Sequence, residues 1–254
     1  MAVLGHRARN LGRWLRAAPP HRWRLRRHRC PSCGGGWVFA VAPGPARARC
    51  AACGLTGTAL SLLPVLADHL AANPDAGPAW EMSTHGPVRP FLARHGIETV
   101  ETEYLPGVPS GTVIDGVRCE DVTATSFGDA SLGLVTCNQV FEHVEDHMAG
   151  FAECHRVLRP GGALIFAVPL GGRATRPVAE TVADRVVFHG RPEHHGSRLT
   201  GPGSVPVFWH FHGPDVVERL RRVGFAAEMR KVPYLPDGPP ARVFYARKPE
   251  DAAP

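Results

Sequence analysis

The sequence predicts an α/β protein in which helices pack on a mostly parallel sheet and a small separate module comes first. Three observations predict this. Beyond Pro78, short apolar runs alternate with amphipathic stretches, as in chains that alternate strands with covering helices. Four of the seven cysteines form two Cys-x-x-Cys pairs near the N-terminus. Charge also divides the chain, because residues 1–67 hold eleven arginines and no lysine or acidic residue, which leaves the remainder net acidic.

The bulk composition is that of a globular protein. With 254 residues, 44% apolar and 20% charged, the chain is long enough to bury a sizeable core. No apolar run approaches the roughly 18 residues that a membrane helix needs, so we expect no membrane span. The N-terminal arginines are not followed by an apolar stretch of signal-peptide type, and we therefore expect a cytoplasmic protein.

The paired cysteines, Cys30 with Cys33 and Cys50 with Cys53, have the spacing of a zinc ribbon over residues 29–57. Each pair can present two sulfurs to one ion from a tight turn. Two disulfides or four free thiols are the alternatives, and a reducing compartment disfavours the disulfides. Four protein ligands leave no open position on the ion, so we assign this zinc a structural role.

The flanks of this module differ in character. Residues 1–28 form a basic, Arg-rich arm that is suited to contact nucleic acid or another acidic partner. The alternative is a disordered tail whose arginines reflect a GC-rich genome. Residues 58–78 are expected to form a linking helix, up to Ala72, and then a loop.

The C-terminal module is expected over residues 79–248, followed by a loose tail at 249–254. Its predicted helices cover residues 87–95, 147–158 and 215–223. Its predicted strands cover residues 79–82, 99–102, 117–119, 132–136, 163–168, 225–232 and 242–247, and the last two form an antiparallel hairpin.

Three motifs in this module carry a resemblance to a known family. They are Glu120-Asp121-Val122 with the run to Val135, then Val140-Phe141-Glu142-His143-Val144, and then His155-Arg156-Val157-Leu158-Arg159-Pro160-Gly161-Gly162. The module resembles class I S-adenosylmethionine-dependent methyltransferases, and within them the type 11 group, over roughly residues 79–170. The resemblance implies a Rossmann-like, seven-stranded mixed sheet that is mostly parallel and ends in the antiparallel hairpin.

The same resemblance implies where S-adenosylmethionine binds. In a parallel sheet, the loops after the strands meet the ligand at the strands' carboxyl ends. An acid that closes the second strand would accept the ribose hydroxyls, and an acid after the third would accept the adenine amino group. The implied cofactor-binding residues are Glu81, Ser83, Gly86, Glu103, Asp121, Val122 and Asn138.

The first motif departs from the family pattern. Where the family has an acid followed by several glycines, this chain keeps Glu81 and Gly86 but places Thr84 and His85 between them. Those side chains would crowd the methionine end of the cofactor. Binding in a modified pose, weak binding and loss of binding all stay open.

Few residues are available for catalysis. His143 is the candidate base near neutral pH, against the simpler reading that its motif only begins and packs a helix. In the His-rich segment at residues 189–212, we consider Glu193, His194 and His195 candidates for substrate contact. An ordinary loop and a second metal site are the alternatives for that segment.

Together these features predict an S-adenosylmethionine-dependent methyltransferase that acts on an unidentified acceptor, most simply a small molecule. Two alternatives stay open. One is an RNA methyltransferase, in which the zinc module and the basic arm contact the nucleic acid. The other is a catalytically inactive protein that keeps the methyltransferase fold and uses the same two features to hold a partner.

Overall fold

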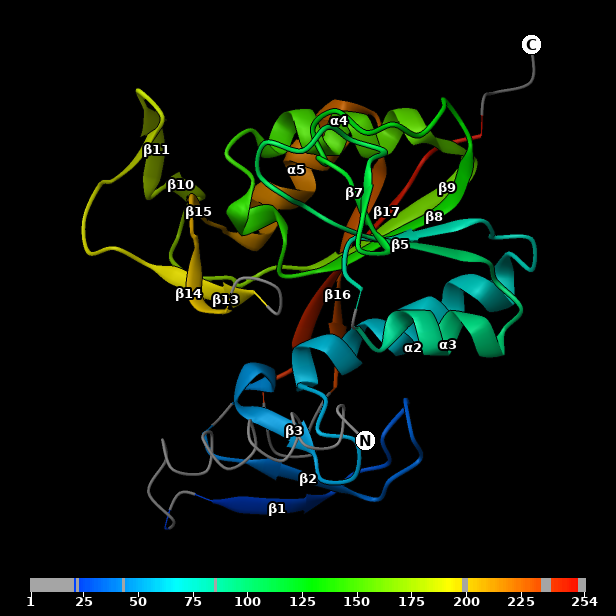
Figure 1. The fold of residues 1–254 in the computed structure, drawn as a ribbon. Helices are drawn as coiled ribbons and strands as arrows, with labels where there is room; N and C mark the ends of the chain where they lie inside the picture. Colours follow the sequence, from blue (N-terminus) through cyan, green and yellow to red (C-terminus); the bar gives the residue numbers. More distant parts are fainter. Residues whose placement is uncertain are drawn as a thin grey trace. The chain divides into compact units, whose positions relative to one another are not determined.

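The computed structural model describes residues 21, 23–42, 44–84, 86–197, 201–233 and 239–250, without the side chain of Pro202 (Figure 1). The chain divides into two compact units, residues 1–72 with 231–243 and residues 73–230 with 244–254. Residues 1–20 of the predicted basic arm, and His85 in the first motif, lie outside the described residues. No helix in the described ranges is long and apolar enough to cross a membrane.

The first unit contains a three-stranded antiparallel sheet formed by β1 (Arg24–Arg27), β2 (Trp37–Ala40) and β3 (Ala48–Cys50). A 3₁₀ turn, η2 (Pro45–Arg47), connects β2 to β3. The strand β1 lies within the residues that the sequence assigned to the basic arm, and it was not predicted. Its Arg-Leu-Arg-Arg sequence has a single apolar residue and therefore no alternation that identifies a strand, but β1 pairs with β2 along its whole length.

The helix α2 (Gly57–Ala72) begins one residue before the predicted linking helix. The hydroxyl of Thr56 accepts a hydrogen bond from the backbone amide of Ala59, which satisfies an amide that the helix itself leaves free. The helix is apolar on more than one side and contains Pro64. Its fully buried leucines are Leu60, Leu62, Leu63 and Leu66.

The second module is built on an eight-stranded sheet in the order β16-β17-β9-β8-β4-β5-β7-β6. The central strands β4, β5, β7, β8 and β9 run parallel, and β17 pairs antiparallel with β9. The eighth strand is the short β6, which pairs antiparallel with β7 and was not predicted. The bounds are β4 (Ala79–Glu81), β5 (Thr99–Glu103), β6 (Val113–Ile114), β7 (Val117–Cys119), β8 (Leu132–Asn138), β9 (Leu158–Ala167), β16 (Ala226–Val232) and β17 (Ala241–Arg247).

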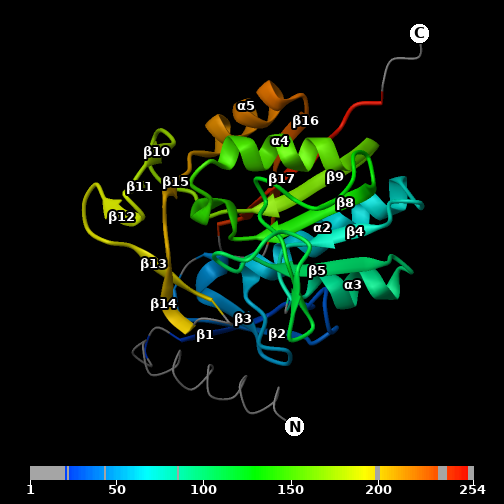
Figure 2. The same cartoon turned by 45° about the horizontal axis from the view of Figure 1, so that its top comes forward.

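Helices cover both faces of this sheet. Figure 2 shows α4 (His147–Val157) and α5 (Gly213–Val223) side by side on one face, with α3 (Val88–Arg94) on the other. Asp146 begins α4 by accepting a hydrogen bond from the amide of Ala149, and Gly224 ends α5 in the left-handed conformation. Between α4 and the sheet lies a core rich in phenylalanine, which includes Phe141, Phe151, Phe166, Phe211 and Phe244.

The segment between β9 and α5 forms short strands outside the main sheet. Figure 1 shows this yellow region beside the sheet. Two hairpins, β11–β12 and β13–β14, are each closed on themselves, while β10 pairs with β15. The bounds are β10 (Arg176–Pro177), β11 (Ala179–Val182), β12 (Arg185–Phe188), β13 (His194–Ser197), β14 (Gly201–Pro206) and β15 (Trp209–His210).

Candidate functional site

Strand register brings the predicted cofactor residues to one edge of the sheet. Glu81 ends β4 opposite Thr136 of β8, and Asn138 ends β8 two residues further along. Glu103 ends β5 opposite Cys119 of β7, and Asp121 follows two residues after that strand ends. The carboxyl ends of these parallel strands therefore present their polar side chains at the same edge, which is where ligands bind in open α/β sheets.

Glu81 lies beneath this edge rather than on its surface. It is 1% exposed, and its carboxylate accepts a hydrogen bond from the hydroxyl of Thr136. Burial raises the pKa of Glu81 to about 8, because a charged carboxylate loses its hydration there. A Cβ atom at Gly86 would lie 3.3 Å from Oε1 of Glu81, so the loop after β4 passes close over this carboxyl group.

The loop after β4 also binds Glu103. The backbone amide and the hydroxyl of Thr84 both donate to Oε1 of Glu103, at 3.0 and 2.8 Å. Thr84, whose side chain we expected to crowd the cofactor, thus donates to one oxygen of Glu103. Glu103 is the carboxylate that we expected to bind the ribose. Ser83, next to it, is partly exposed.

The loop after β7 is held by its own hydrogen bonds. Oδ1 of Asp121 accepts from the backbone amide and the hydroxyl of Thr123, at 2.8 and 2.7 Å, and the amide of Asp121 donates to the hydroxyl of Ser110. Val122 is buried in the main core. These bonds fix the direction of the loop and engage one of the two oxygens of the Asp121 carboxylate.

Asn138 carries an unsatisfied polar atom at the same edge. Its Oδ1 is buried and has no hydrogen-bond partner among the described residues. A buried amide oxygen of this kind is rare in folded proteins, since an unmade hydrogen bond costs about 1–3 kcal/mol. Its position at the end of β8, beside the strands that carry Glu81 and Glu103, marks a place where a bound molecule would supply a donor.

The histidine candidate His143 belongs to a second cluster beyond the same strand. It lies in η3 (Phe141–His143), and its Nε2 is 3.0 Å from Nδ1 of His195 in β13. Oε1 of Glu142 lies 3.7 Å from Nε2 of His143 and 3.5 Å from Nδ1 of His195. Burial lowers the pKa of His143, whereas the nearby carboxylate of Glu142 raises the pKa of His195.

Packing explains how η3 reaches this position. The α4 residue Gly150 approaches η3 so closely that an added Cβ would lie 3.1 Å from the ring of Phe141. The backbone amide of Phe208 donates to the carbonyl of Glu142 at 2.8 Å, which ties the chain after β14 to η3. These two contacts bring the Glu-His pair of the motif and the β13–β14 hairpin together.

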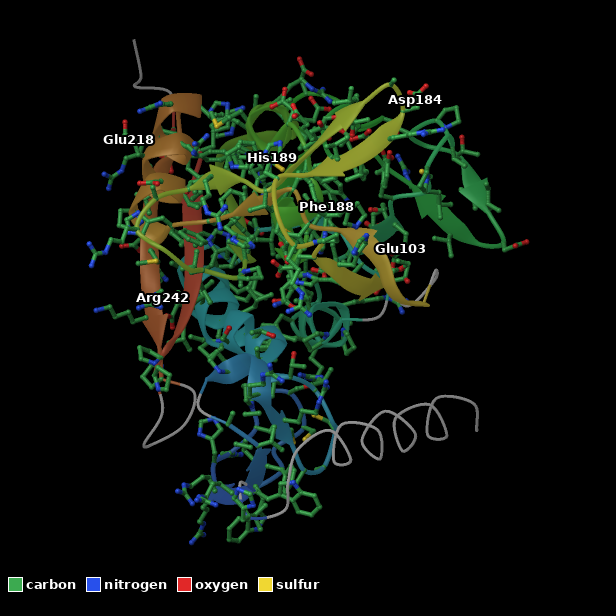
Figure 3. All side chains as sticks on the ribbon, turned by 90° about the vertical axis from the view of Figure 1, so that its left-hand side faces the viewer. Glu103, Asp184, Phe188, His189, Glu218 and Arg242 are labelled. Carbon is green, nitrogen blue, oxygen red and sulfur yellow. The ribbon has the colours of Figure 1, made fainter. Side chains whose placement is uncertain are left out.

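The predicted substrate residues do not all join this cluster. Glu193 lies beside it, with its carboxylate 3.8 Å from Nε2 of His195 and 2.7 Å from Nε2 of His210. His194 is exposed, and its ring packs instead against Phe188. Figure 3 shows Asp184 at the tip of the β11–β12 hairpin, with Phe188 and His189 at its other end.

Glu142 is the residue that sequence analysis missed as a site residue. It is part of a quoted motif, but one of the residues that faces it, His195, is far away in the sequence. The available signal was the Glu-His pair directly after a buried strand, combined with the later histidines.

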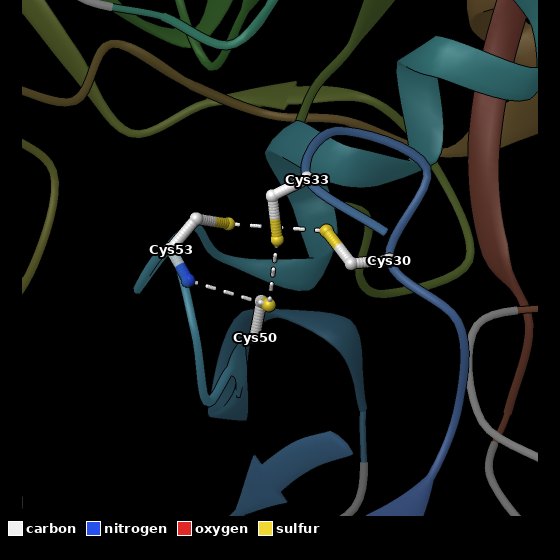
Figure 4. Close-up of side chains that lie close together, drawn as sticks. All are labelled: Cys30, Cys33, Cys50 and Cys53. Atoms are coloured by element: carbon white, nitrogen blue, oxygen red, sulfur yellow. Dashed lines mark hydrogen bonds between the residues drawn. The ribbon is translucent and has the colours of Figure 1, made fainter. Parts of the chain in front are cut away.

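The four cysteines of the first unit converge on one point (Figure 4). The Sγ atoms of Cys30 and Cys53 are 3.8 Å apart, and those of Cys33 and Cys50 are 3.6 Å apart. Four sulfurs bound to one zinc at about 2.3 Å would stand about 3.8 Å from one another at tetrahedral angles. None of the cysteines forms a disulfide.

Comparison with known proteins gives a family match over part of the chain. Residues 91–166 match a family model described as a methyltransferase domain. Malonyl-[acyl-carrier protein] O-methyltransferase 1 of Coxiella burnetii is 43% identical over 47 residues, which are 18% of this chain and 17% of that enzyme. The chain thus spans about a sixth of the length of this curated relative.

Solved structures resemble the fold over a longer stretch. The 1,6-didemethyltoxoflavin-N1-methyltransferase of Burkholderia thailandensis, solved with 1,6-didemethyltoxoflavin and S-adenosylhomocysteine, has a TM-score of 0.50 and 17% identity, covering 75% of this chain and 79% of that chain. An S-adenosylmethionine-dependent methyltransferase of Mesorhizobium loti has a TM-score of 0.48 and 20% identity, covering 74% and 97%.

These findings agree with the strand order and the motifs. The family match runs from α3 to β9 and contains all three motifs, and the sheet has the parallel centre and antiparallel end that the resemblance implied. Residues 91–166 are therefore identified as a methyltransferase domain with a Rossmann-like α/β fold, and the N-terminal sheet carries a cluster of four cysteines.

Proposed function

We propose that this chain transfers a methyl group from S-adenosylmethionine to a small-molecule acceptor. The observation that carries the proposal is the edge formed by the ends of β4, β5 and β8, where Asn138 holds an unsatisfied buried oxygen next to the strand that ends in Glu81. The bound ligand of one structurally similar methyltransferase, 1,6-didemethyltoxoflavin, supports a small acceptor.

Bound at this edge, the cofactor supplies a methyl group on a positively charged sulfur. The residues at the edge would bind and orient it. Glu103 would accept from the ribose hydroxyls through Oε2, because Thr84 engages Oε1. Asp121 would accept from the adenine amino group, with the amide of Val122 donating to the ring, and Asn138 would contact the methionine part.

The loop after β4 would provide the remaining contacts. Ser83 and Gly86 would face the cofactor, with the buried carboxyl of Glu81 supporting the loop from below. His143 stays a candidate base, and Glu193, His194 and His195 stay candidates for acceptor contact. Of these, His143, His195 and Glu193 lie near one another, which favours them over the outlying His194.

Isothermal titration of the intact protein with S-adenosylmethionine and S-adenosylhomocysteine tests the cofactor site. We expect micromolar binding that is lost in Glu103→Ala and in Asp121→Ala. Glu101→Gln is the matched control, because it lies on the same strand and pairs with Arg89 at 3.3 Å. Binding that survives both alanine variants would contradict the proposed residues.

Absence of binding by the intact protein would instead favour the inactive binding protein. The contact between Thr84 and Glu103 supports the inactive binding protein. Through this contact the chain itself donates to the carboxylate that would otherwise accept from the ribose. An RNA acceptor would depend on the basic arm. Of that arm, the structure describes residues 21 and 23–28, and Arg24 and Arg27 in β1 are exposed.

We also propose that Cys30, Cys33, Cys50 and Cys53 bind one structural Zn²⁺, with the chain in a reducing, cytoplasmic compartment that keeps thiolates available. The sulfur spacing near that of a tetrahedral site supports this. Elemental analysis of the purified protein should find zinc bound to these thiolates, and the Cys33→Ser variant should lose it. A folded wild-type protein without metal at the cysteines would contradict the proposal.

A further inference from the structure

Three ligand atoms converge beyond the carboxyl end of β8: Oε1 of Glu142, Nε2 of His143 and Nδ1 of His195. Their separations are 3.0, 3.5 and 3.7 Å. Ligand atoms about 2.0–2.1 Å from one metal ion stand about 3.3 Å apart at tetrahedral angles. The three ligand atoms are therefore already about as far apart as they would be when bound to one metal ion.

The carboxylate of Glu142 supplies an independent observation. The residue is 1% exposed, and neither of its oxygens accepts a hydrogen bond within the described residues. A buried carboxylate without donors is costly unless a cation compensates it. Nε2 of His143 and Nδ1 of His195 both face Oε1 of this carboxylate.

The outer nitrogen of each histidine faces an oxygen atom, and that of His143 is within hydrogen-bond distance. Metal-ligating histidines usually donate the other ring N–H to a carbonyl or a carboxylate, which fixes the tautomer. Nδ1 of His143 is 2.6 Å from the carbonyl oxygen of Pro206, so it carries the proton and Nε2 keeps its lone pair. On His195 the outer nitrogen faces Glu193 at 3.8 Å, and that carboxylate is held by His210.

We propose that Glu142, His143 and His195 form a second metal site that binds one divalent transition-metal ion. Two imidazoles and one carboxylate suit Zn²⁺, Co²⁺ or Fe²⁺, whereas Mg²⁺ prefers an all-oxygen set. Three protein ligands leave at least one coordination position open, unlike the four cysteines. The half-exposed ring of His195 places that opening toward solvent.

The open position gives the ion a role that rests on the proposed function. Glu142 and His143 follow β8 by a few residues, beyond the edge where Asn138 would meet the methionine part of the cofactor. An acceptor with an oxygen or nitrogen donor, such as a phenol or a hydroxy acid, would bind the ion there. The ion would then position the acceptor and lower the pKa of its donor group.

Metal content and Co²⁺ binding test the site. After incubation with excess Zn²⁺ and desalting, wild-type protein should retain two equivalents of zinc, and Glu142→Gln and His195→Asn should each retain one. His194→Asn is the matched control, because its ring is exposed and packs on Phe188 outside the cluster. The Cys33→Ser variant should lose the other equivalent, which separates the two sites.

Protein that holds zinc only at the four cysteines is titrated with Co²⁺. This titration gives the affinity of the second site for Co²⁺. Glu142→Gln should abolish the visible Co²⁺ bands of nitrogen and oxygen ligation, and Glu193→Gln should weaken binding about 10–100-fold through its outer position. His195→Asn alters a hairpin side chain, so unchanged thermal unfolding of that variant excludes misfolding as the cause.

Wild-type protein that holds only one equivalent and shows no such bands would overturn the proposal and leave an ion pair between His195 and Glu142. Cofactor titration is read separately. Co²⁺ binding without S-adenosylmethionine binding would refute the proposed function and retain the metal site, and the reverse result would refute the metal site alone.

Discussion

The hydroxyl and the backbone amide of Thr84 donate to the same oxygen of Glu103, so the loop after β4 is fastened to the end of β5. In a methyltransferase with a glycine-rich loop, no side chain would compete for that acid. Here the cofactor's ribose and Thr84 would share one carboxylate. If the proposed site binds the cofactor, this contact would couple the altered first motif to cofactor affinity.

Replacing Thr84 with alanine should therefore tighten S-adenosylmethionine binding. The substitution removes one donor from Glu103, and a hydrogen bond to a charged group contributes about 1.5–3 kcal/mol, of which competition recovers part. We expect a Kd several-fold lower by isothermal titration. Thr84→Ser keeps the hydroxyl and should bind as the wild type does, while weaker binding by the alanine variant would show that Thr84 assists the cofactor.

Glu81 should make the folded protein less stable as the pH rises. Its pKa is about 8 in the fold against 4.5 for the free group, so its favourable contribution is complete below pH 4.5 and is lost as the pH rises through about 8. Glu81→Gln removes this loss and can still accept from Thr136. Urea denaturation should find the variant more stable than wild type near the upper end of that range, with the difference shrinking toward the lower end.

The control for this prediction is Glu98→Gln, an exposed change in the turn before β5. It should leave the pH dependence of unfolding as it is in the wild type. A parallel shift of the Glu81→Gln curve at every pH would mean that the carboxyl group acts through packing and not through its ionisation.

His147 should make the folded protein less stable as the pH falls. Its ring is packed between Phe151, Trp209 and Phe211, and burial, reinforced by Arg219, lowers its pKa to about 4 from 6.5. The neutral ring is the form that fits, so its contribution is complete above pH 6.5 and is lost as the pH falls toward 4. The loss amounts to at most about 3 kcal/mol.

In the His147→Gln variant, the free energy of unfolding should fall less steeply as the pH decreases. Lost packing should nevertheless lower the stability of this variant near neutral pH. Chemical denaturation across the range from pH 6.5 to 4 measures the slope. His189→Gln, an exposed change at the end of β12, provides the comparison. Equal slopes in wild type and His147→Gln would assign acid sensitivity to other groups.

Removing the proposed zinc with a chelator should destabilise the small sheet of the first unit and leave the main sheet unchanged. If zinc joins Cys30 and Cys33 to Cys50 and Cys53, its removal should release β2 and β3, because so small a sheet has little core of its own. Hydrogen exchange should then speed up at Val38 and Cys50 while the amides of β8 keep their protection. Unchanged exchange after zinc removal would show that the sheet is stable without metal.

The parts of the fold that the sequence predicted are those with strong local patterns. The parallel strands, the helices α4 and α5 and the cysteine pairs all follow from apolar runs, helix ends and spacing. For β8 and α4, predicted and observed bounds differ by at most two residues. Family motifs then directed attention to the edge of the sheet where the proposed cofactor residues lie.

The remaining features depend on contacts between distant residues. The strands β10, β13, β14 and β15 contain histidine, glycine or proline without alternation, and backbone bonds such as that from Phe208 to Glu142 hold this segment. The meeting of His195 with Glu142 needs this tertiary arrangement and leaves no mark on local sequence. The prediction of a general substrate-contact segment was therefore as far as pattern reasoning could go.

The hydrogen bond between Phe208 and the carbonyl of Glu142 has an evolutionary consequence. The chain leaves η3, builds α4 and β9, and returns to the same residue after the two hairpins. Insertions or deletions at the tip of the β11–β12 hairpin would leave that junction in place, since loop length costs little free energy. Descendants of this protein could thus change the segment between β9 and α5, and with it the proposed acceptor contacts, while the proposed cofactor edge of the sheet stays the same.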